Sequence, residues 1–282
     1  MRKLLGVVAG LILAGTLTAC GGSSATATPA AAPQGGTPKA DAPLKVGVNP
    51  VPHGQILKFV KDNLAAKAGL NLEIVEFTDY VQPNVQLDEG QLDANYFQHI
   101  PYLEEFSKGK NITLSWVAPV HIEPLGLYSK KIKNISELAK GAQVALPNDV
   151  SNLGRSLKLL ADNGVITLKE GVGVKATEHD VAGNPKELQF KPLEAAQLPR
   201  SLEDVDAAII NGNYALEAGL QPATDSLILE KGEGNPYANG LVTVPAKVGD
   251  PRVKKLAELL QGPEVKKFIQ DTYKGAVLPA VQ

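Results

Sequence analysis

Short apolar runs alternate with segments of helical periodicity along most of the chain. The apolar run from Leu44 to Val48 precedes a stretch, Gly54 to Ala68, whose apolar residues recur on one helical face, and Leu70 to Phe77 resumes an extended pattern. This order predicts a βαβ unit with parallel strands and a right-handed crossover. Ligands of such units bind beyond the carboxyl ends of the strands, which is where Asp79 and Tyr80 fall.

The same alternation continues to the C-terminal end of the sequence. Helices are predicted at 83–90, 134–141 and before Gly164, two more follow Asp250, and apolar strand patterns lie between them. No internal repeat or heptad interrupts this order, so the predicted fold class is α/β. The apolar stretch around Glu123 is broken by prolines, and we place there a crossing from one domain to another.

One segment, DANYFQHIPYL from Asp93 to Leu103, stands out in a chain that is only 5% aromatic. It holds four ring side chains: Tyr96, Phe97, His99 and Tyr102. Polar residues break both the helical and the strand period, and this predicts a loop that leads into a short helix with Pro101 in its first turn. Such a loop would line a pocket. The alternative, a strand end in the core with a hydrogen-bonded histidine, stays open.

Polar residues also follow two of the later predicted strands. A polar loop of Asn148, Asp149, Ser151 and Asn152 is expected before an amphipathic helix, with Arg155 in the first turn of that helix. An arginine there opposes the helix dipole, so it indicates either a clamp on a bound carboxylate or a salt-bridged or solvent-facing side chain. Asn211, after the strand VDAAII, is expected either to contact a ligand or to cap the following helix.

The N-terminal segment has the features of a secretory signal. Arg2 and Lys3 precede an apolar run that is too short to span a bilayer as a mature helix, so residues 1–19 are predicted to be removed. The run ends in LTAC, which resembles the lipobox of bacterial lipoproteins, and Cys20 is the only cysteine. We expect Cys20 to carry lipid, and residues 20–43, which lack aromatic and long aliphatic side chains, to form a flexible tether.

Charge and motif content exclude several classes of function. The chain carries 28 Lys and Arg against 30 Asp and Glu, so no nucleic-acid partner is expected. It has no GxSxG or HExxH motif and no second cysteine, and its four histidines are scattered, so we expect no hydrolase, no metal and no cofactor. A solute-binding protein and an anchored scaffold or adhesin remain as the alternatives.

Six motifs then occur in one characteristic order: LTAC, Asp79–Tyr80, DANYFQHIPYL, PNDVSNLGR, INGNYA and NPYANG. In this order and spacing the chain resembles the NlpA-type lipoproteins, the methionine-binding proteins of bacterial ABC importers. The resemblance covers residues 44–282. It implies a type II periplasmic-binding-protein fold in which residues 44–123 plus 241–282 form one lobe and residues 124–240 the other, with a ligand cleft and two crossing strands between them.

The resemblance also implies a binding site and partners. It places the subsite for the ligand side chain on Tyr80, Phe97, His99 and Tyr102. It places the groups that hold the amino-acid backbone on Asn152, Arg155, Asn211 and Asn239. The implied partners are L-methionine, an ABC permease with its ATPase, and the membrane through the lipid anchor. D-methionine, a derivative, another apolar amino acid and a small peptide stay open as ligands, because apolar pockets discriminate a methylene by only about 1–3 kcal/mol.

Overall fold

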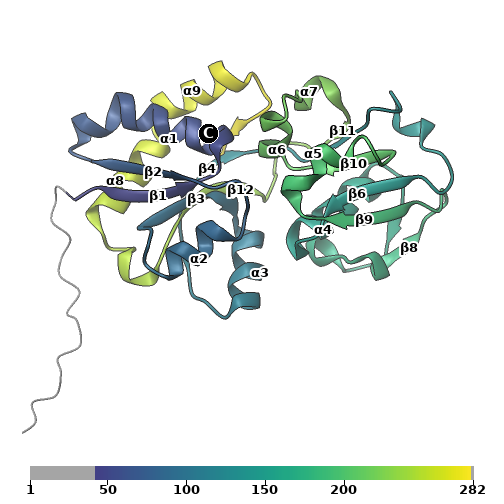
Figure 1. Ribbon diagram of the computed structural model, residues 1–282, viewed down its shortest axis with the longest axis horizontal. Coiled ribbons are helices and arrows are strands. Elements are labelled where there is room, and N and C mark those ends of the chain that lie inside the picture. The colour runs from purple at the N-terminus through teal and green to yellow at the C-terminus, as the bar shows by residue number, and fades with distance from the viewer. Residues whose placement is uncertain (1–41, 281–282) are drawn as a thin grey trace, which may run out of the picture. The chain divides into compact units, whose positions relative to one another are not determined.

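Two β-sheets with flanking helices make up residues 42–280, the part of the chain that this computed structural model describes (Figure 1). The described residues belong to one compact unit. The predicted α/β class is confirmed. The predicted signal, the lipidation at Cys20 and nearly all of the tether lie outside the described residues. Within 42–280, no helix combines the length and the apolar character needed to cross a bilayer.

The first sheet has six strands in the order β13-β4-β12-β3-β1-β2. Their bounds are β1(Leu44–Val48), β2(Leu72–Glu76), β3(Ala94–His99), β4(Ser115–Ile122), β12(Ala238–Thr243) and β13(Leu278–Pro279). β1 runs parallel to both β2 and β3, with Val46 opposite Ile74 and Ala94. β12 runs antiparallel to β3 and β4. The predicted βαβ unit is therefore formed by β1, the helix after it and β2.

Helices cover both faces of this sheet. Their bounds are α1(Gln55–Val60), α2(Gln82–Asp88), α3(Ile100–Lys110), α8(Pro251–Leu260) and α9(Pro263–Tyr273). Figure 1 shows α1 and α9 on one side of the strands and α2 and α3 on the other. Helical turns continue α1 to Gly69, whose φ of 66° lies in the left-handed region that glycine tolerates best. Leu57, Leu256 and Ile269 are buried together in the main core of this sheet.

The second sheet has five strands in the order β11-β5-β10-β6-β9. Its strands are β5(Gly126–Tyr128), β6(Gln143–Pro147), β9(Gln189–Leu193), β10(Ala207–Ile210) and β11(Ser226–Leu229), beside a small pair β7(Thr167–Leu168) and β8(Val181–Gly183). Its helices are α4(Val150–Asp162), α5(Leu198–Ser201), α6(Gly212–Glu217) and α7(Pro222–Asp225). β6 runs parallel to β9 and β10, and Leu157 and Leu160 of α4 pack with Val144 of β6 in the core. The helix predicted at 134–141 is only the single turn Ile135–Glu137.

The chain passes between the two sheets twice. It leaves the first sheet after β4 and enters the second at β5, and it returns between β11 and β12. Each sheet with its helices forms one lobe. The predicted two-lobed binding-protein fold with two crossing segments is thus confirmed.

The aromatic segment folds differently from the predicted loop. Residues Ala94–His99 form the inner strand β3, and every residue of it is buried. The polar side chains that broke the apolar period bond to one another, because Asn84 of α2 exchanges hydrogen bonds of 2.7–2.9 Å with Asn95 and Gln98. A buried amide ladder of this kind satisfies its own donors and acceptors. The loop prediction was therefore wrong, and the alternative, a strand end in the core with a hydrogen-bonded histidine, is the one observed. The helix entered through Pro101 is present as α3.

Helix α4 begins earlier than predicted. It starts at Val150, and the carboxylate of Asp149 accepts the backbone N–H of Asn152 at 2.9 Å as its N-terminal cap. Ser151 and Asn152 therefore lie inside the helix instead of a preceding loop. Arg155 moves from the predicted first turn into the second, so the argument from the helix dipole no longer applies to it.

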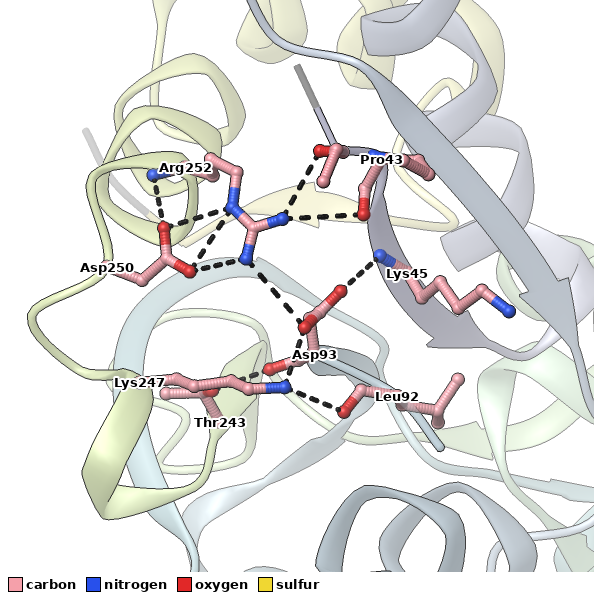
Figure 2. A network of polar contacts seen from close by, with 9 residues as sticks. Pro43, Lys45, Leu92, Asp93, Thr243, Lys247, Asp250 and Arg252 are labelled. Atoms are coloured by element: carbon pink, nitrogen blue, oxygen red, sulfur yellow. Dashed lines mark hydrogen bonds and ion pairs between the residues drawn. The ribbon is translucent and has the colours of Figure 1, made fainter. Parts of the chain in front are cut away.

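A polar network ties the start of the described chain to the first sheet (Figure 2). Asp93 accepts the backbone N–H of Lys45 at 2.8 Å and pairs with the Lys247 ammonium at 2.6 Å. Arg252, at the start of α8, pairs with Asp250 and donates to the carbonyl oxygens of Ala42 and Pro43 at 3.2 and 3.4 Å. These bonds hold the beginning of β1 beside β3 and α8.

Candidate functional site

A narrow cavity lies where residues of the two lobes meet. Its empty space, counted up to the open solvent, measures about 320 Å³. We call this cavity the slot. Twelve residues line it: Tyr80, Phe97, Gln98, His99, Tyr102, Glu123, Asn152, Arg155, Asn211, Gly212, Asn213 and Asn239. All eight residues named from the sequence resemblance are among them.

Aromatic rings form one end of the slot. Phe97 lies within β3, Tyr102 lies in the first turn of α3, and Tyr80 precedes α2, with ring centroids 5.7–6.0 Å apart. The Tyr102 hydroxyl donates to the carbonyl oxygen of Tyr80 at 2.9 Å, and the Tyr80 hydroxyl donates to Asn213 Oδ1 at 2.5 Å. Burial raises the pKa of both tyrosines well above the ordinary range, so both stay neutral. This end offers an uncharged apolar wall.

His99 joins the aromatic end to the polar end. It is the N-terminal cap of α3, and its Nδ1 accepts the backbone N–H of Tyr102 at 3.2 Å. Nε2 therefore carries the proton and donates to Asn152 Oδ1, also at 3.2 Å. Burial, together with the positive charge of Arg155, lowers the pKa of His99 to about 3. The imidazole is neutral at physiological pH and fixes the orientation of Asn152.

Three asparagines form the polar end from the side of the second sheet. Asn211 Nδ2 donates to Asn152 Oδ1 at 3.2 Å, and no hydrogen bond from its side chain caps α6. Two buried atoms of these asparagines have no hydrogen-bond partner among the described residues, namely Asn211 Oδ1 and Asn213 Nδ2. Buried polar atoms of native proteins are normally paired. These two atoms offer a ligand a hydrogen-bond acceptor and a hydrogen-bond donor.

Arg155 is buried beside the asparagines and is already paired. Its Nε and Nη2 donate to the two carboxylate oxygens of Glu230 at 3.0 and 2.5 Å, and Nη2 also reaches the carbonyl oxygen of Glu123 at 2.9 Å. The guanidinium carbon lies 4.1 Å from the ring centre of Tyr237, a cation–π contact. Of the two roles considered from the sequence, the salt bridge is the one observed. Within residues 42–280, no hydrogen bond uses Nη1.

The sequence reasoning missed four residues that line the slot: Gln98, Glu123, Gly212 and Asn213. Glu123 was used only to place the crossing, although an acidic residue between apolar runs is a usable signal. Asn213 lies two residues after Asn211 in the same INGNYA motif, but only Asn211 was predicted to contact a ligand. Glu230, the partner of Arg155, lies outside every motif that the reasoning used.

Glu123 belongs to a group of side chains with metal-ligand chemistry. The donor atoms of His53, His121 and Glu123 lie within 4.8 Å of one another, and all three residues are buried. His121 Nε2 lies 2.7 Å and His53 Nε2 lies 3.2 Å from the same carboxylate oxygen. His121 Nε2 donates its proton to this oxygen and His53 Nε2 donates its proton to Asn239 Oδ1, so neither Nε2 offers the lone pair that a metal ion requires.

A slot between two α/β lobes, apolar at one end and rich in hydrogen-bonding groups at the other, defines a two-lobed solute-binding protein. The profile of the NlpA lipoprotein family matches residues 44–281, and the chain belongs to this family. Outer membrane lipoprotein 2 of Mannheimia haemolytica is 40% identical over 277 residues, which cover 98% of each chain. The D-methionine-binding lipoprotein MetQ of Escherichia coli K12 is 43% identical over 237 residues, covering 83% of this chain and 87% of its own.

A solved structure has the same fold. It is a nutrient-binding protein from Burkholderia cenocepacia bound to methionine, with a TM-score of 0.81 and 46% sequence identity. The likeness covers 84% of this chain and 99% of the Burkholderia protein.

Proposed function

We propose that this protein binds methionine in the slot and delivers it to the permease of an ABC importer, without catalysing a reaction. The aromatic residues Tyr80, Phe97 and Tyr102, with His99, would hold the thioether side chain. The groups of the polar end, Asn152, Arg155, Asn211 and Asn239, would hold the amino-acid backbone.

The observation that carries this proposal is the pair of unpartnered atoms at the polar end of the slot. Asn211 Oδ1 can accept a hydrogen bond from an ammonium group, and Asn213 Nδ2 can donate one to a carboxylate. The rings at the other end match an unbranched thioether, because sulfur makes favourable contacts with aromatic edges. A methionine-bound relative with the same fold supports this choice of ligand.

Calorimetry on protein stripped of ligand by partial unfolding and refolding tests the proposal. We expect L-methionine to bind with a Kd between micromolar and nanomolar, which corresponds to roughly 8–12 kcal/mol. D-methionine, norleucine and leucine measured alongside it separate the thioether from other apolar side chains. Tighter binding of leucine than of methionine would identify a different apolar amino acid, and absence of binding by all four would favour a scaffold role.

We further propose that Cys20 carries the lipid that anchors the protein outside the cytoplasm. The lipobox-like LTAC at the end of an apolar run supports this, as does membership of a lipoprotein family. Cys20→Ser should leave a protein that fractionates with the soluble material or keeps its signal. Full retention in the membrane, with a lipid label still present, would show that the anchor lies elsewhere.

A further inference from the structure

Glu123 places a buried carboxylate in the wall of the slot. It follows β4 directly, at the point where the chain leaves the first sheet, and it is only 5% exposed. Gly212 of the second lobe packs against it so closely that a Cβ built on this glycine would lie 2.7 Å from the Cβ of Glu123. The side chain is therefore confined from both lobes.

One neutral imidazole donates to this carboxylate, and a second lies beside it. The Tyr96 hydroxyl donates to His121 Nδ1, so His121 Nε2 carries a proton and donates it to Glu123 at 2.7 Å. His53 Nε2 lies 3.2 Å from Glu123 Oε1 and 3.2 Å from Asn239 Oδ1, and because both neighbours are acceptors it also carries a proton. Burial lowers the pKa of His53 to about 4 and that of His121 to about 3. Neither imidazole supplies positive charge.

No lysine or arginine in residues 42–280 forms an ion pair with the Glu123 carboxylate. Arg155 reaches only the backbone carbonyl of Glu123, and its own charge faces Glu230. The Glu123 side chain also accepts a hydrogen bond from the backbone N–H of Asn213, which stabilises its charged form. A buried carboxylate that lacks a counter-ion is unfavourable, so a cationic group entering the slot would relieve this cost.

We propose that Glu123 is the anionic partner of the ligand's α-ammonium group, and that His121 is a positioning residue that fixes its carboxylate. This inference rests on the proposed function and narrows the ligand class to molecules with a free amino group. The N–H group of His121 holds the carboxylate in place without neutralising it. A ligand whose amino group is missing or acylated would leave Glu123 buried and unpaired, and would be rejected.

The test compares L-methionine with 4-(methylthio)butanoate, the same molecule without the amino group, by calorimetry on stripped protein. The wild-type protein should bind the analogue at least about 100-fold more weakly than methionine. This loss is expected when a buried polar group of a binding site, here the Glu123 carboxylate, is left without its partner. Glu123→Gln should weaken methionine binding by about 100-fold and change binding of the analogue by less than about threefold. His121→Gln should also reduce the ratio of the affinity for methionine to the affinity for the analogue. If His121 had a purely structural role, its substitution would weaken both ligands alike and leave this ratio unchanged.

Glu104→Gln, an exposed residue of α3, is the matched control and should change neither affinity. Equal weakening of both ligands by Glu123→Gln would overturn the proposal, since it would indicate a structural role. Equal affinities of the wild-type protein for the two ligands would also overturn the proposal. Because this comparison needs no variant, it tests the proposal even if Glu123→Gln does not fold. If the wild-type protein binds no methionine, the proposed ligand is wrong, and the amino acid it does bind is compared with its own desamino analogue.

Discussion

The guanidinium of Arg155 and the carboxylate of Glu230 face each other in a two-point ion pair, with Nε 3.0 Å from Oε1 and Nη2 2.5 Å from Oε2. Burial alone would raise the pKa of Glu230, but the charge and hydrogen bonds of Arg155 outweigh it and hold that pKa below the ordinary value. One edge of the guanidinium is therefore occupied by a residue of the same chain. In the proposed function a ligand carboxylate meets the remaining edge, which carries Nη1.

Arg155→Ala should weaken methionine binding by at least about 30-fold, since a charge-assisted contact is lost. It should also lower the unfolding free energy, because Glu230, with a side chain 17% exposed, loses its counter-ion. Glu230→Gln leaves the positive charge of Arg155 in place and should weaken methionine binding by less than about tenfold. Calorimetry and urea unfolding separate the two effects, with Lys158→Ala on the exposed side of α4 as the control. Equal affinities for wild-type and Arg155→Ala proteins would contradict the carboxylate role.

Asp93 is the centre of the network in Figure 2, where it meets Lys45, Lys247 and Arg252. Asp93→Asn should lower the unfolding free energy by about 2–3 kcal/mol, because two cationic side chains lose a partly buried anion and one amide loses its charged acceptor. Urea unfolding measures this. Asp271→Asn, in the exposed pair with Lys267 on α9, should cost less than about 1 kcal/mol. Similar losses in the two variants would show that the network adds nothing beyond a surface pair.

Three buried neutral histidines predict a dependence of stability on pH. Burial lowers the pKa of His53 to about 4, and the pKa values of His99 and His121 to about 3, all from an ordinary value of 6.5. As the pH falls below about 6.5 the unfolded chain takes up protons that the native protein does not, so the unfolding free energy falls continuously toward pH 4. The raised pKa of Glu123 acts in the opposite sense but involves a single group.

Urea unfolding at pH 7 and pH 5 measures this loss, which should amount to several kcal/mol, since each pKa unit corresponds to about 1.4 kcal/mol. His121→Gln should make the dependence shallower, whereas His179→Gln, an exposed position, should leave the slope unchanged. A stability that does not change between pH 7 and pH 5 would contradict the neutral assignment of the histidines.

Sequence patterns predicted the fold well where the periodicity of the apolar residues and the residues that start or stop an element indicate the same boundaries. The first βαβ unit and the helices after Asp250 follow the expected order, because each has an apolar face and a defined start or stop signal. The segment Ala94–His99 was misread because Asn95 and Gln98 are buried yet bond to Asn84, a long-range partner that local periodicity does not reveal. The eight site residues were named through motif resemblance and not through spacing.

The parts of the site that were missed depend on tertiary contacts. Glu230 is far from Arg155 in the sequence and outside the motifs, so only the folded chain shows their ion pair. The convergence of His53 and His121 on Glu123 likewise joins three segments whose relation is set by the sheet and the crossing. Residue type alone gave no reason to connect His53 with Glu123.

Direct contacts join residues on either side of the crossing, and we expect the two lobes to close over the ligand. The Tyr80 hydroxyl bonds to Asn213 at 2.5 Å, and Glu105 of α3 pairs with Lys175 at 2.7 Å. A ligand held by both sides binds the closed state better than an open one and shifts the population toward closure. An affinity between micromolar and nanomolar, roughly 8–12 kcal/mol, would outweigh a hinge cost of a few kcal/mol.

Small-angle scattering on stripped protein, with and without L-methionine, should show a smaller radius of gyration in the bound sample. Lys175→Met removes the contact to Glu105 at the rim and should speed methionine release by a few-fold at most, because an exposed ion pair is worth about 0.2–1 kcal/mol. Lys158→Met breaks a similar pair with Asp162 inside one helix and should leave the release rate unchanged. Identical radii of gyration, with binding confirmed in the same samples, would instead favour a preformed pocket that ligand enters without lobe movement.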